Sequence, residues 1–184
     1  MQTVLANVNG TVHRVPSIDP AWLEADSPVT FWVDLAAPTP EEADILRGFF
    51  HFHELAIEDS LAESHHPKVE SYGTFLYVIL HGIDFEAAKH RFATHDTDFF
   101  VGPNYLVTVH DGTSRSIAAM HGVCERNEHV LSKGPVELLH RIVDAKPLFS
   151  AQEGHSPCHS SRPKTAPKSS TRTGGRKTPS RSCS

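Results

Sequence analysis

Residues 51–80 read HFHELAIEDSLAESHHPKVESYGTFLYVIL, and their pattern is the strongest indication of the fold. An acidic pair leads through a Pro-Lys-Val-Glu turn into an almost unbroken apolar segment at residues 74–82. That segment is apolar at both odd and even positions, which predicts a central strand covered on both faces rather than a half-exposed one. The stretch therefore predicts a buried sheet with helices packed against it.

The first part of the stretch, residues 55–62, predicts a short helix. Ile57 and Leu61 are four residues apart and should share the core-facing stripe. Asp59 lies two residues beyond Ile57, about 200° round the helix, so its carboxylate should point away from the core. Together with the neighbouring Glu58, it presents an acidic pair to solvent.

Toward the N-terminus, residues 4–8 and 11–15 are strand-like runs separated by Asn9 and Gly10. An Asn-Gly pair suits the positive φ angles of a type I′ turn, which predicts a β-hairpin. Residues 31–35, FWVDL, predict a further strand.

A helix should begin after Thr39. Thr39 suits the N-cap, Pro40 the first helical position and Glu42 the closing position of a capping box. The apolar residues that follow at three- and four-residue spacing should form its core face: Ala43, Leu46, Phe49 and Phe50.

The rest of the folded part contains a second hairpin and two more helices. Residues 97–101 and 105–110 flank a Gly-Pro-Asn link. Helical periodicity covers residues 114–128 and 135–145. The core face of the last helix is predicted to carry Val136, Leu139, Ile142 and Val143.

These elements favour an α+β fold with a mixed, largely antiparallel sheet layered with helices. One domain should span residues 1–145. Residues 146–184 are rich in Ser, Pro, Thr, Lys and Arg and predict a disordered basic tail, because such a segment cannot bury enough surface to offset its ordering entropy. Since Pro147 interrupts the last helix, Leu138, Leu139 and Ile142 should be short of packing partners.

Composition restricts the function. The net charge of −5 conceals an acidic body, since every acidic residue except Glu153 precedes residue 146. Such a body repels nucleic acid and attracts divalent cations. Three cysteines show no metal-type spacing. No signal peptide is recognisable, and no apolar run approaches the roughly 20 residues of a membrane span, so the chain is expected to be soluble and cytoplasmic.

Three kinds of chemistry bear on this composition: metal binding by carboxylates, zinc binding by histidines, and enzymatic catalysis. Glu58 and Asp59 suit the weak, water-mediated binding of Mg²⁺, although from sequence alone acidic pairs more often simply solvate a helix surface. The histidines at 51, 53, 65 and 66 raise a zinc hypothesis, but their spacing matches no zinc motif, which favours surface or capping roles. No nucleophile elbow or phosphate-binding loop occurs, so an enzyme is not expected.

Four motifs together resemble the N-terminal cytoplasmic domain of the CorA family. Residues 32–42 match a W-[IV]-D-[IL] strand followed by a P-T-x-E-E helix start. Residues 53–72 resemble H-P-L-x-[IL]-E-D-x-L-x-x-x-Q-R-P-K-V-E-x-[YF] without a gap. Residues 102–110 resemble G-x-N-[YF]-L-[VI]-T-V-H, and residues 138–145 resemble L-L-x-x-[IL]-V-D-A. The matches keep the family order over residues 30–145.

This resemblance implies a pentameric channel in the plasma membrane that is selective for Mg²⁺, also passes Co²⁺ and Ni²⁺, and has a cytoplasmic part that senses magnesium. It further implies regulatory metal sites between subunits at Glu58, Asp59 and Asp144. Mg²⁺ is the expected regulatory ion, bound weakly, with Co²⁺ as a second candidate. Two departures lie near this site: Glu54 replaces a family proline, and His65-His66 replaces Gln-Arg.

The family's stalk helix, two membrane helices and Gly-Met-Asn motif are not found in this sequence. We therefore expect a truncated fragment that cannot transport ions alone. The segment from Lys146 onward is hypothesised to be an out-of-frame or aberrant terminus, which reading the other frames of the gene would test. The alternative is a soluble adaptor or nucleic-acid-associated protein that uses the basic tail, through salt-sensitive contacts to phosphate.

Overall fold

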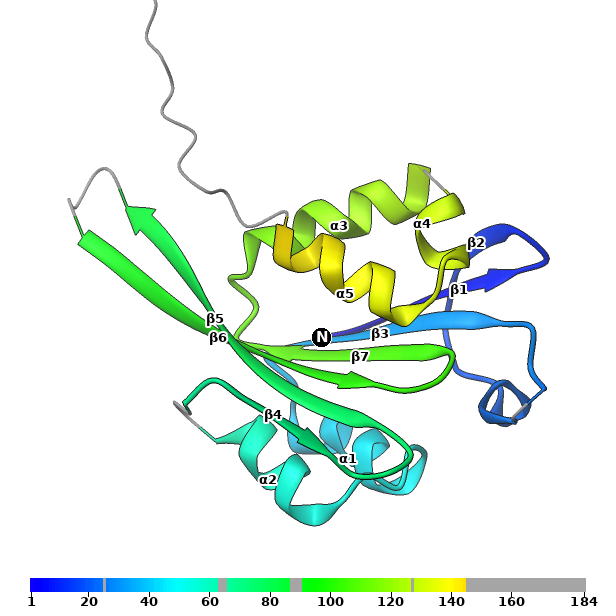
Figure 1. Cartoon of the computed structure of the whole chain (residues 1–184), viewed down its shortest axis with the longest axis horizontal. Coiled ribbons are helices and arrows are strands. Elements are labelled where there is room, and N and C mark those ends of the chain that lie inside the picture. The colour runs from blue at the N-terminus through cyan, green and yellow to red at the C-terminus, as the bar shows by residue number, and fades with distance from the viewer. Residues whose placement is uncertain (25, 63–65, 87–90, 127, 145–184) are drawn as a thin grey trace, which may run out of the picture. The chain divides into compact units, whose positions relative to one another are not determined.

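A mixed seven-stranded sheet forms the centre of the computed structural model (Figure 1). The structure describes residues 1–24, 26–62, 66–86, 91–126 and 128–144. The tail predicted from residue 146 onward lies outside them. The strands are β1 (Gln2–Val8), β2 (Thr11–Val15), β3 (Thr30–Ala36), β4 (Lys68–Ser71), β5 (Leu76–Glu86), β6 (Arg91–Val101) and β7 (Tyr105–His110), in the spatial order β2-β1-β3-β7-β6-β5-β4.

Among the described strands, only β3 and β7 pair in parallel, and every other neighbouring pair is antiparallel. The described helices are the 3₁₀ turn η1 (Pro20–Leu23), α1 (Pro40–Gly48), α2 (Glu54–Leu61), α3 (Arg115–Arg126), α4 (Glu128–Ser132) and α5 (Pro135–Asp144). The predicted α+β class with a largely antiparallel mixed sheet is therefore confirmed.

Both predicted hairpins form. Asn9 and Gly10 adopt φ angles of 53° and 87°, as the turn between β1 and β2 requires. Between β6 and β7, the Gly102 N–H donates to the Tyr105 carbonyl at 2.9 Å. A Cβ atom at Gly102 would overlap the Tyr105 ring, so this position needs glycine because of the close approach.

The predicted start of α1 is also confirmed. Thr39 Oγ1 accepts a hydrogen bond from the Glu42 N–H at 3.3 Å, and the Glu42 carboxylate accepts one from the Thr39 N–H at 3.1 Å. Pro40 occupies the first turn. These local bonds satisfy backbone groups that the helix itself leaves without partners.

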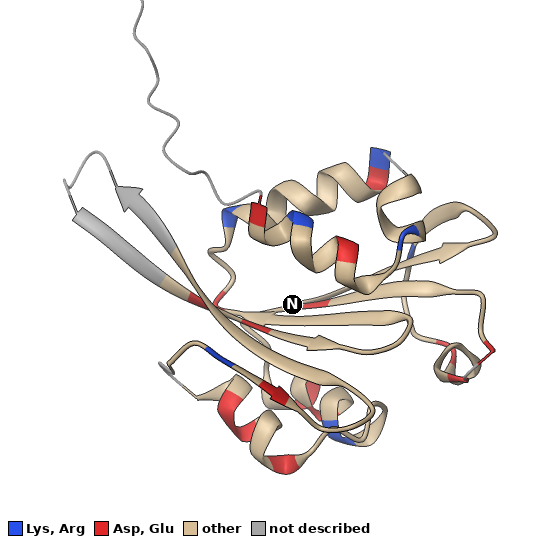
Figure 2. Ribbon diagram, in the orientation of Figure 1, with Lys and Arg blue, Asp and Glu red and all other residues tan. Residues whose placement is uncertain are grey.

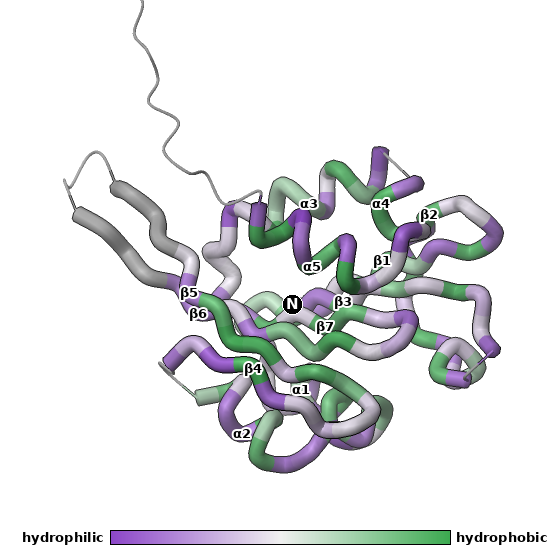
Figure 3. The backbone as a smooth tube through the Cα atoms, in the orientation of Figure 1, coloured by the Kyte–Doolittle hydropathy of each residue, from purple (hydrophilic) through white to green (hydrophobic). Residues whose placement is uncertain are grey.

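The sheet separates two apolar layers (Figure 3). Phe31, Val33 and Leu35 of β3 face α1 and α2. Trp32, the intervening residue, faces the opposite side with residues of α3, α4 and α5. Because side chains alternate along a strand, one apolar strand serves both cores.

The last helix packs differently from its prediction. Pro135, Leu138 and Ile142 are buried in α5, whereas Val136 is 66% exposed. The expectation that Leu138 and Ile142 lack partners is wrong, because both are fully buried with residues of α3, α4 and the sheet. Ile142 is buried as predicted, but the first two positions of the apolar stripe were assigned one residue too late, because the adjacent apolar pairs Leu138-Leu139 and Ile142-Val143 leave the face of this helix ambiguous.

Two strand assignments also change. The predicted turn at residues 67–70 contains part of β4, which forms the sheet edge. The adjacent β5 is consequently the penultimate strand and not a central one. Tyr77, Val78 and Ile79 are nonetheless buried on both faces, as predicted, while Leu76 is 43% exposed near the edge. A four-residue strand carries too little periodicity to be recognised from its sequence.

Candidate metal-binding surface and the polar clusters around it

Helix α2 presents the predicted acidic pair. Its N-cap is His53, whose Nδ1 accepts a hydrogen bond from the Leu55 N–H at 3.2 Å. Ala56 and Ile57 are buried and hold the helix against the sheet. Glu58 is exposed on the outer surface of the helix. Figure 2 shows acidic residues along α2.

The environment of Asp59 differs from its prediction. The side chain is only 29% exposed, and its Oδ2 atom lies 2.6 Å from the Nζ atom of Lys68 on β4. Lys68 Nζ also lies 3.2 Å from Glu70. The hydrogen bond to Asp59 is the main cause that raises the pKa of Lys68, so the ammonium remains charged. Asp59 therefore faces the edge strand, because a cation on that strand attracts it.

The buried face of α2 is also rotated relative to the prediction. Ser60 is buried and donates to the Ile57 carbonyl at 2.9 Å, whereas Leu61 is 46% exposed. Ile57 is buried as predicted. A helix of eight residues can tilt toward the sheet, and the position of its buried face is then set by tertiary packing.

The departure at Glu54 is neutralised by an arginine. Arg47 Nε of α1 donates to Glu54 Oε2 at 3.0 Å. This hydrogen bond is the largest cause that lowers the pKa of Glu54. The extra carboxylate is thus paired locally. In the second departure, His65 lies outside the described residues and His66 is exposed.

Asp144 is far from the acidic pair in the layered fold. It ends α5, is 67% exposed at its side chain, and lies 3.3 Å from His140 one turn earlier. Helices α5 and α2 cover opposite faces of the sheet (Figure 1). One chain therefore does not bring Asp144 together with Glu58 and Asp59.

Two of the histidines considered for zinc, His51 and His53, make other contacts. His53 caps α2 and packs against Tyr72 with ring centroids 5.1 Å apart. His51 Nδ1 lies 3.1 Å from the Arg47 carbonyl oxygen. Within the described ranges, no three His, Cys, Asp or Glu residues are arranged to hold a metal ion.

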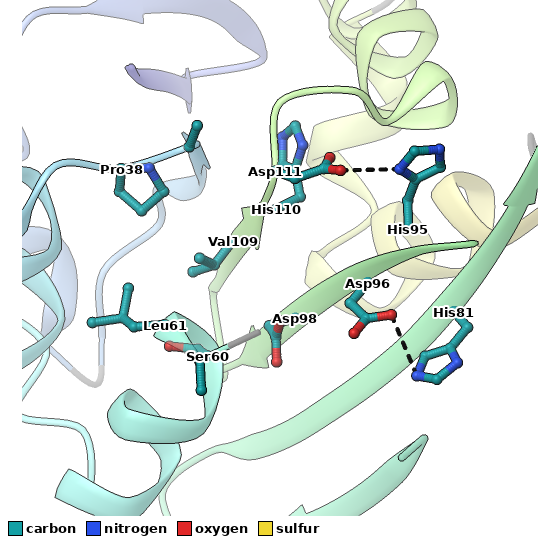
Figure 4. Close-up of a pocket in the computed structure, with 12 residues that line it drawn as sticks. Pro38, Ser60, Leu61, His81, His95, Asp96, Asp98, Val109, His110 and Asp111 are labelled. Atoms are coloured by element: carbon teal, nitrogen blue, oxygen red, sulfur yellow. Dashed lines mark hydrogen bonds and ion pairs between the residues drawn. The ribbon is translucent and has the colours of Figure 1, made fainter. Parts of the chain in front are cut away.

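A polar cavity that the sequence did not predict lies beyond the end of α2 (Figure 4). Its volume is about 470 Å³. His81 faces Asp96 across β5 and β6 at 3.4 Å, and His95 Nδ1 lies 2.9 Å from Asp111 Oδ2. Buried Asp98 accepts the Tyr77 hydroxyl at 2.5 Å. Asp96 and Asp98 are two residues apart on a strand, so their side chains lie on one face of the sheet. This spacing is the sequence signal that could have indicated the cavity.

A buried network on the opposite face surrounds Asp34. One carboxylate oxygen accepts Thr108 Oγ1 at 2.5 Å and lies 3.1 Å from His110 Nε2, and the other lies 2.8 Å from His121 Nε2. Burial raises the pKa of Asp34, but the hydrogen bonds from these residues outweigh it and hold the pKa well below its ordinary value. The network connects β3, β7 and α3.

No helix in the described part of the chain is both long and apolar enough to cross a membrane. Residues 29–146 match the family model of the CorA-like Mg²⁺ transporter protein. A curated relative, the putative metal ion transporter YfjQ of Bacillus subtilis (strain 168), is 32% identical over 136 residues, which are 74% of this chain and 39% of the relative.

Solved structures share the fold. The complete CorA magnesium transporter of Methanocaldococcus jannaschii aligns with a TM-score of 0.64 and 20% identity, over 79% of this chain and 44% of that one. Its soluble domain aligns with a TM-score of 0.63 and 20% identity, over 77% and 54%. The cytoplasmic domain of ZntB from Vibrio parahaemolyticus aligns with a TM-score of 0.56 and 15% identity, over 78% and 56%.

The family match covers more than half of the chain, and its residues include strands β3 to β7 and helices α1 to α5. The fold agrees with that of the CorA soluble domain. This chain therefore belongs to the family of CorA-like Mg²⁺ transporter proteins.

Proposed function

We propose that this chain acts as a cytoplasmic Mg²⁺-sensing domain of a CorA-like metal ion transport protein. The observation that carries the proposal is the position of Glu58 and Asp59. Both lie on α2, which buried Ala56 and Ile57 hold against the sheet, so the two carboxylates have a defined place at the surface. Oxygen ligands of this kind suit a hydrated Mg²⁺ ion, with Co²⁺ as a second ion.

The proposed site is completed by a second copy of the chain. Asp144 lies in the opposite helical layer from Glu58 and Asp59, so an ion that contacts all three must bridge two chains. A bound divalent cation would reduce repulsion between the facing carboxylates, and its loss would favour separation of the copies. The pentamer implied by the family resemblance would place such contacts around a ring.

Ion passage is proposed to belong to other parts of the relatives. The chain spans 39% of the length of the curated relative and about half of the solved CorA and ZntB chains. We infer that this chain supplies the sensing part only, and that transport requires the segments of those proteins that it does not match.

The test is an Mg²⁺ titration of the purified chain, followed by thermal unfolding and sedimentation velocity. Millimolar MgCl₂ should raise Tm and the sedimentation coefficient. Asp59→Asn should reduce both responses, because it removes the negative charge of one carboxylate ligand. Asp26→Asn, the same change at an exposed position near η1, serves as the matched control.

The control variant should respond as the unmodified chain does. Sensing by this chain is refuted if millimolar MgCl₂ changes neither Tm nor the sedimentation coefficient while NaCl of equal ionic strength serves as the reference. Equal responses of Asp59→Asn and the unmodified chain would instead place the bound ion elsewhere.

A further inference from the structure

The ammonium group of Lys68 already occupies one side of the Asp59 carboxylate. Its Nζ atom lies 2.6 Å from Asp59 Oδ2, and the two side chains are 30% and 29% exposed. Lys68 begins β4, the edge strand, so the ammonium comes from a different element than its partner. A cation supplied by the chain itself is therefore placed where the proposed function needs a divalent ion.

The surroundings of Lys68 offer it a second position. Nζ lies 3.2 Å from Glu70 Oε2 and 5.5 Å from the centroid of the Tyr77 ring. Glu70 is itself held by the Tyr72 hydroxyl, which donates to it at 3.0 Å. If the ammonium leaves Asp59, it keeps an anionic partner and an aromatic face, so its release does not leave an isolated charge.

The charges of the two cations differ. Lys68 carries one positive charge toward Asp59, while the neighbouring Glu58 is exposed on the same helix. A divalent ion that binds at this surface supplies two charges to the same pair of carboxylates. The ion replaces the ammonium only when its concentration is high enough for the free energy of binding to exceed the free energy lost with the Lys68–Asp59 contact.

We propose that Lys68 is a tethered competitor for the metal ion, which binds Asp59 when the ion is absent and must move away before the ion binds. This inference rests on the proposed function and adds its regulation: the lysine sets the Mg²⁺ concentration at which the site fills. Exposed ion pairs of this kind correspond to a roughly two- to five-fold change in binding constant. Removal of Lys68 should therefore tighten Mg²⁺ binding by that factor.

The experiment is an NMR titration of the ¹⁵N-labelled chain with MgCl₂ at constant ionic strength and constant protein concentration. The measured quantity is the Mg²⁺ concentration that gives half of the shift of the Glu58 and Asp59 amide signals. Three variants are compared with the unmodified chain: Lys68→Gln, Lys68→Arg and the charge-matched control Lys133→Gln. Lys133 precedes α5 on the opposite face of the sheet, so it reports the general effect of losing one positive charge.

Lys68→Gln should lower the half-saturating concentration roughly two- to five-fold relative to Lys133→Gln. Lys68→Arg keeps the charge and should raise that concentration, because a guanidinium can bind a carboxylate through two nitrogens. Circular dichroism and Tm establish that each variant is folded. The Lys68→Arg comparison remains decisive if Lys68→Gln does not fold.

The outcomes separate the two hypotheses. Saturating shifts at α2 with the same half-saturating concentration in all variants would overturn the competition and leave the sensor in place, as would tighter binding by Lys68→Arg. Shifts that appear only after Lys68→Gln would support the competition. No Mg²⁺-dependent shift at α2 in any variant would overturn the proposed sensor and the competition together.

Discussion

Replacement of Asp34 by alanine should destabilise this protein more than any single change at the acidic surface of α2. The Asp34 carboxylate accepts hydrogen bonds from groups on two other elements. Thr108 and His110 belong to β7, and His121 belongs to α3. The side chains of Asp34 and His110 are 7% and 4% exposed, and that of His121 is 17% exposed.

The magnitude follows from the donors left without a partner. An unsatisfied buried donor costs about 1–3 kcal/mol, and the Thr108 hydroxyl can rotate toward another acceptor while the two imidazoles cannot. Because His110 and His121 share one carboxylate, their costs are not additive. Asp34→Ala should therefore lower the free energy of unfolding by about 3–5 kcal/mol.

The assay is urea unfolding followed by tryptophan fluorescence. Trp32 is a direct reporter, because its Nε1 donates to Thr108 Oγ1 at 3.0 Å and its ring stacks on His121 with centroids 4.3 Å apart. Asp34→Asn keeps one carbonyl oxygen, so it should cost less than alanine. Asp26→Ala, at an exposed position, should stay within about 0.5 kcal/mol of the unmodified chain.

A loss below about 1 kcal/mol for Asp34→Ala, with an unchanged m-value, would refute this reasoning. It would mean that water or a rearranged α3 satisfies both imidazoles without cost. A fluorescence change in the folded state with unchanged stability would locate the effect at Trp32 alone.

Three further predictions concern the acid range and two turns. The pKa of Asp34 is lower in the folded state, so its stabilising contribution is present above the unfolded-state pKa of about 3.9 and is lost as the pH falls toward the lower folded value. Urea unfolding between pH 5 and pH 2 should therefore show a smaller decline of the free energy of unfolding in Asp34→Asn than in the unmodified chain. Thr39→Ala should cost about 1 kcal/mol, since it removes one half of a capping box, and Thr39→Ser should restore most of it in the same assay. Gly102→Ala should cost about 1–3 kcal/mol, because the new methyl group would meet the buried Tyr105 ring; thermal unfolding should show a lower Tm, and an unchanged Tm would contradict the close contact.

The parts of the fold that sequence predicts well are those governed by neighbours along the chain. Asn9 and Gly10 determine their own turn, and Thr39 and Glu42 bond each other across three residues. The nearly continuous apolar run of residues 31–35 is equally local. Each such signal depends on backbone geometry within a few residues, so it survives without knowledge of the rest of the molecule.

The candidate site shows the opposite dependence. The sequence placed Glu58 and Asp59 side by side on a helix, and α2 does present them. It did not reveal that Lys68 would bind Asp59, because β4 was not recognised as a strand. The Asp34 network was missed because its histidine on α3 is distant in the sequence and becomes a neighbour of Asp34 only in the folded chain.

The sequence alone was enough to predict the α+β class, both hairpins, the start of α1 and the family of the chain. These conclusions depend on the spacing of apolar residues, on turn and capping residues and on the order of motifs, all of which can be read along the chain. Only the tertiary structure decided which carboxylates meet and which remain apart. The sheet places α2 and α5 on opposite faces, which separates Glu58 and Asp59 from Asp144, and its edge strand brings Lys68 to Asp59. The physical reason is that strand order and helix packing are set by contacts between distant segments, and an ion-pair partner is selected by position in space.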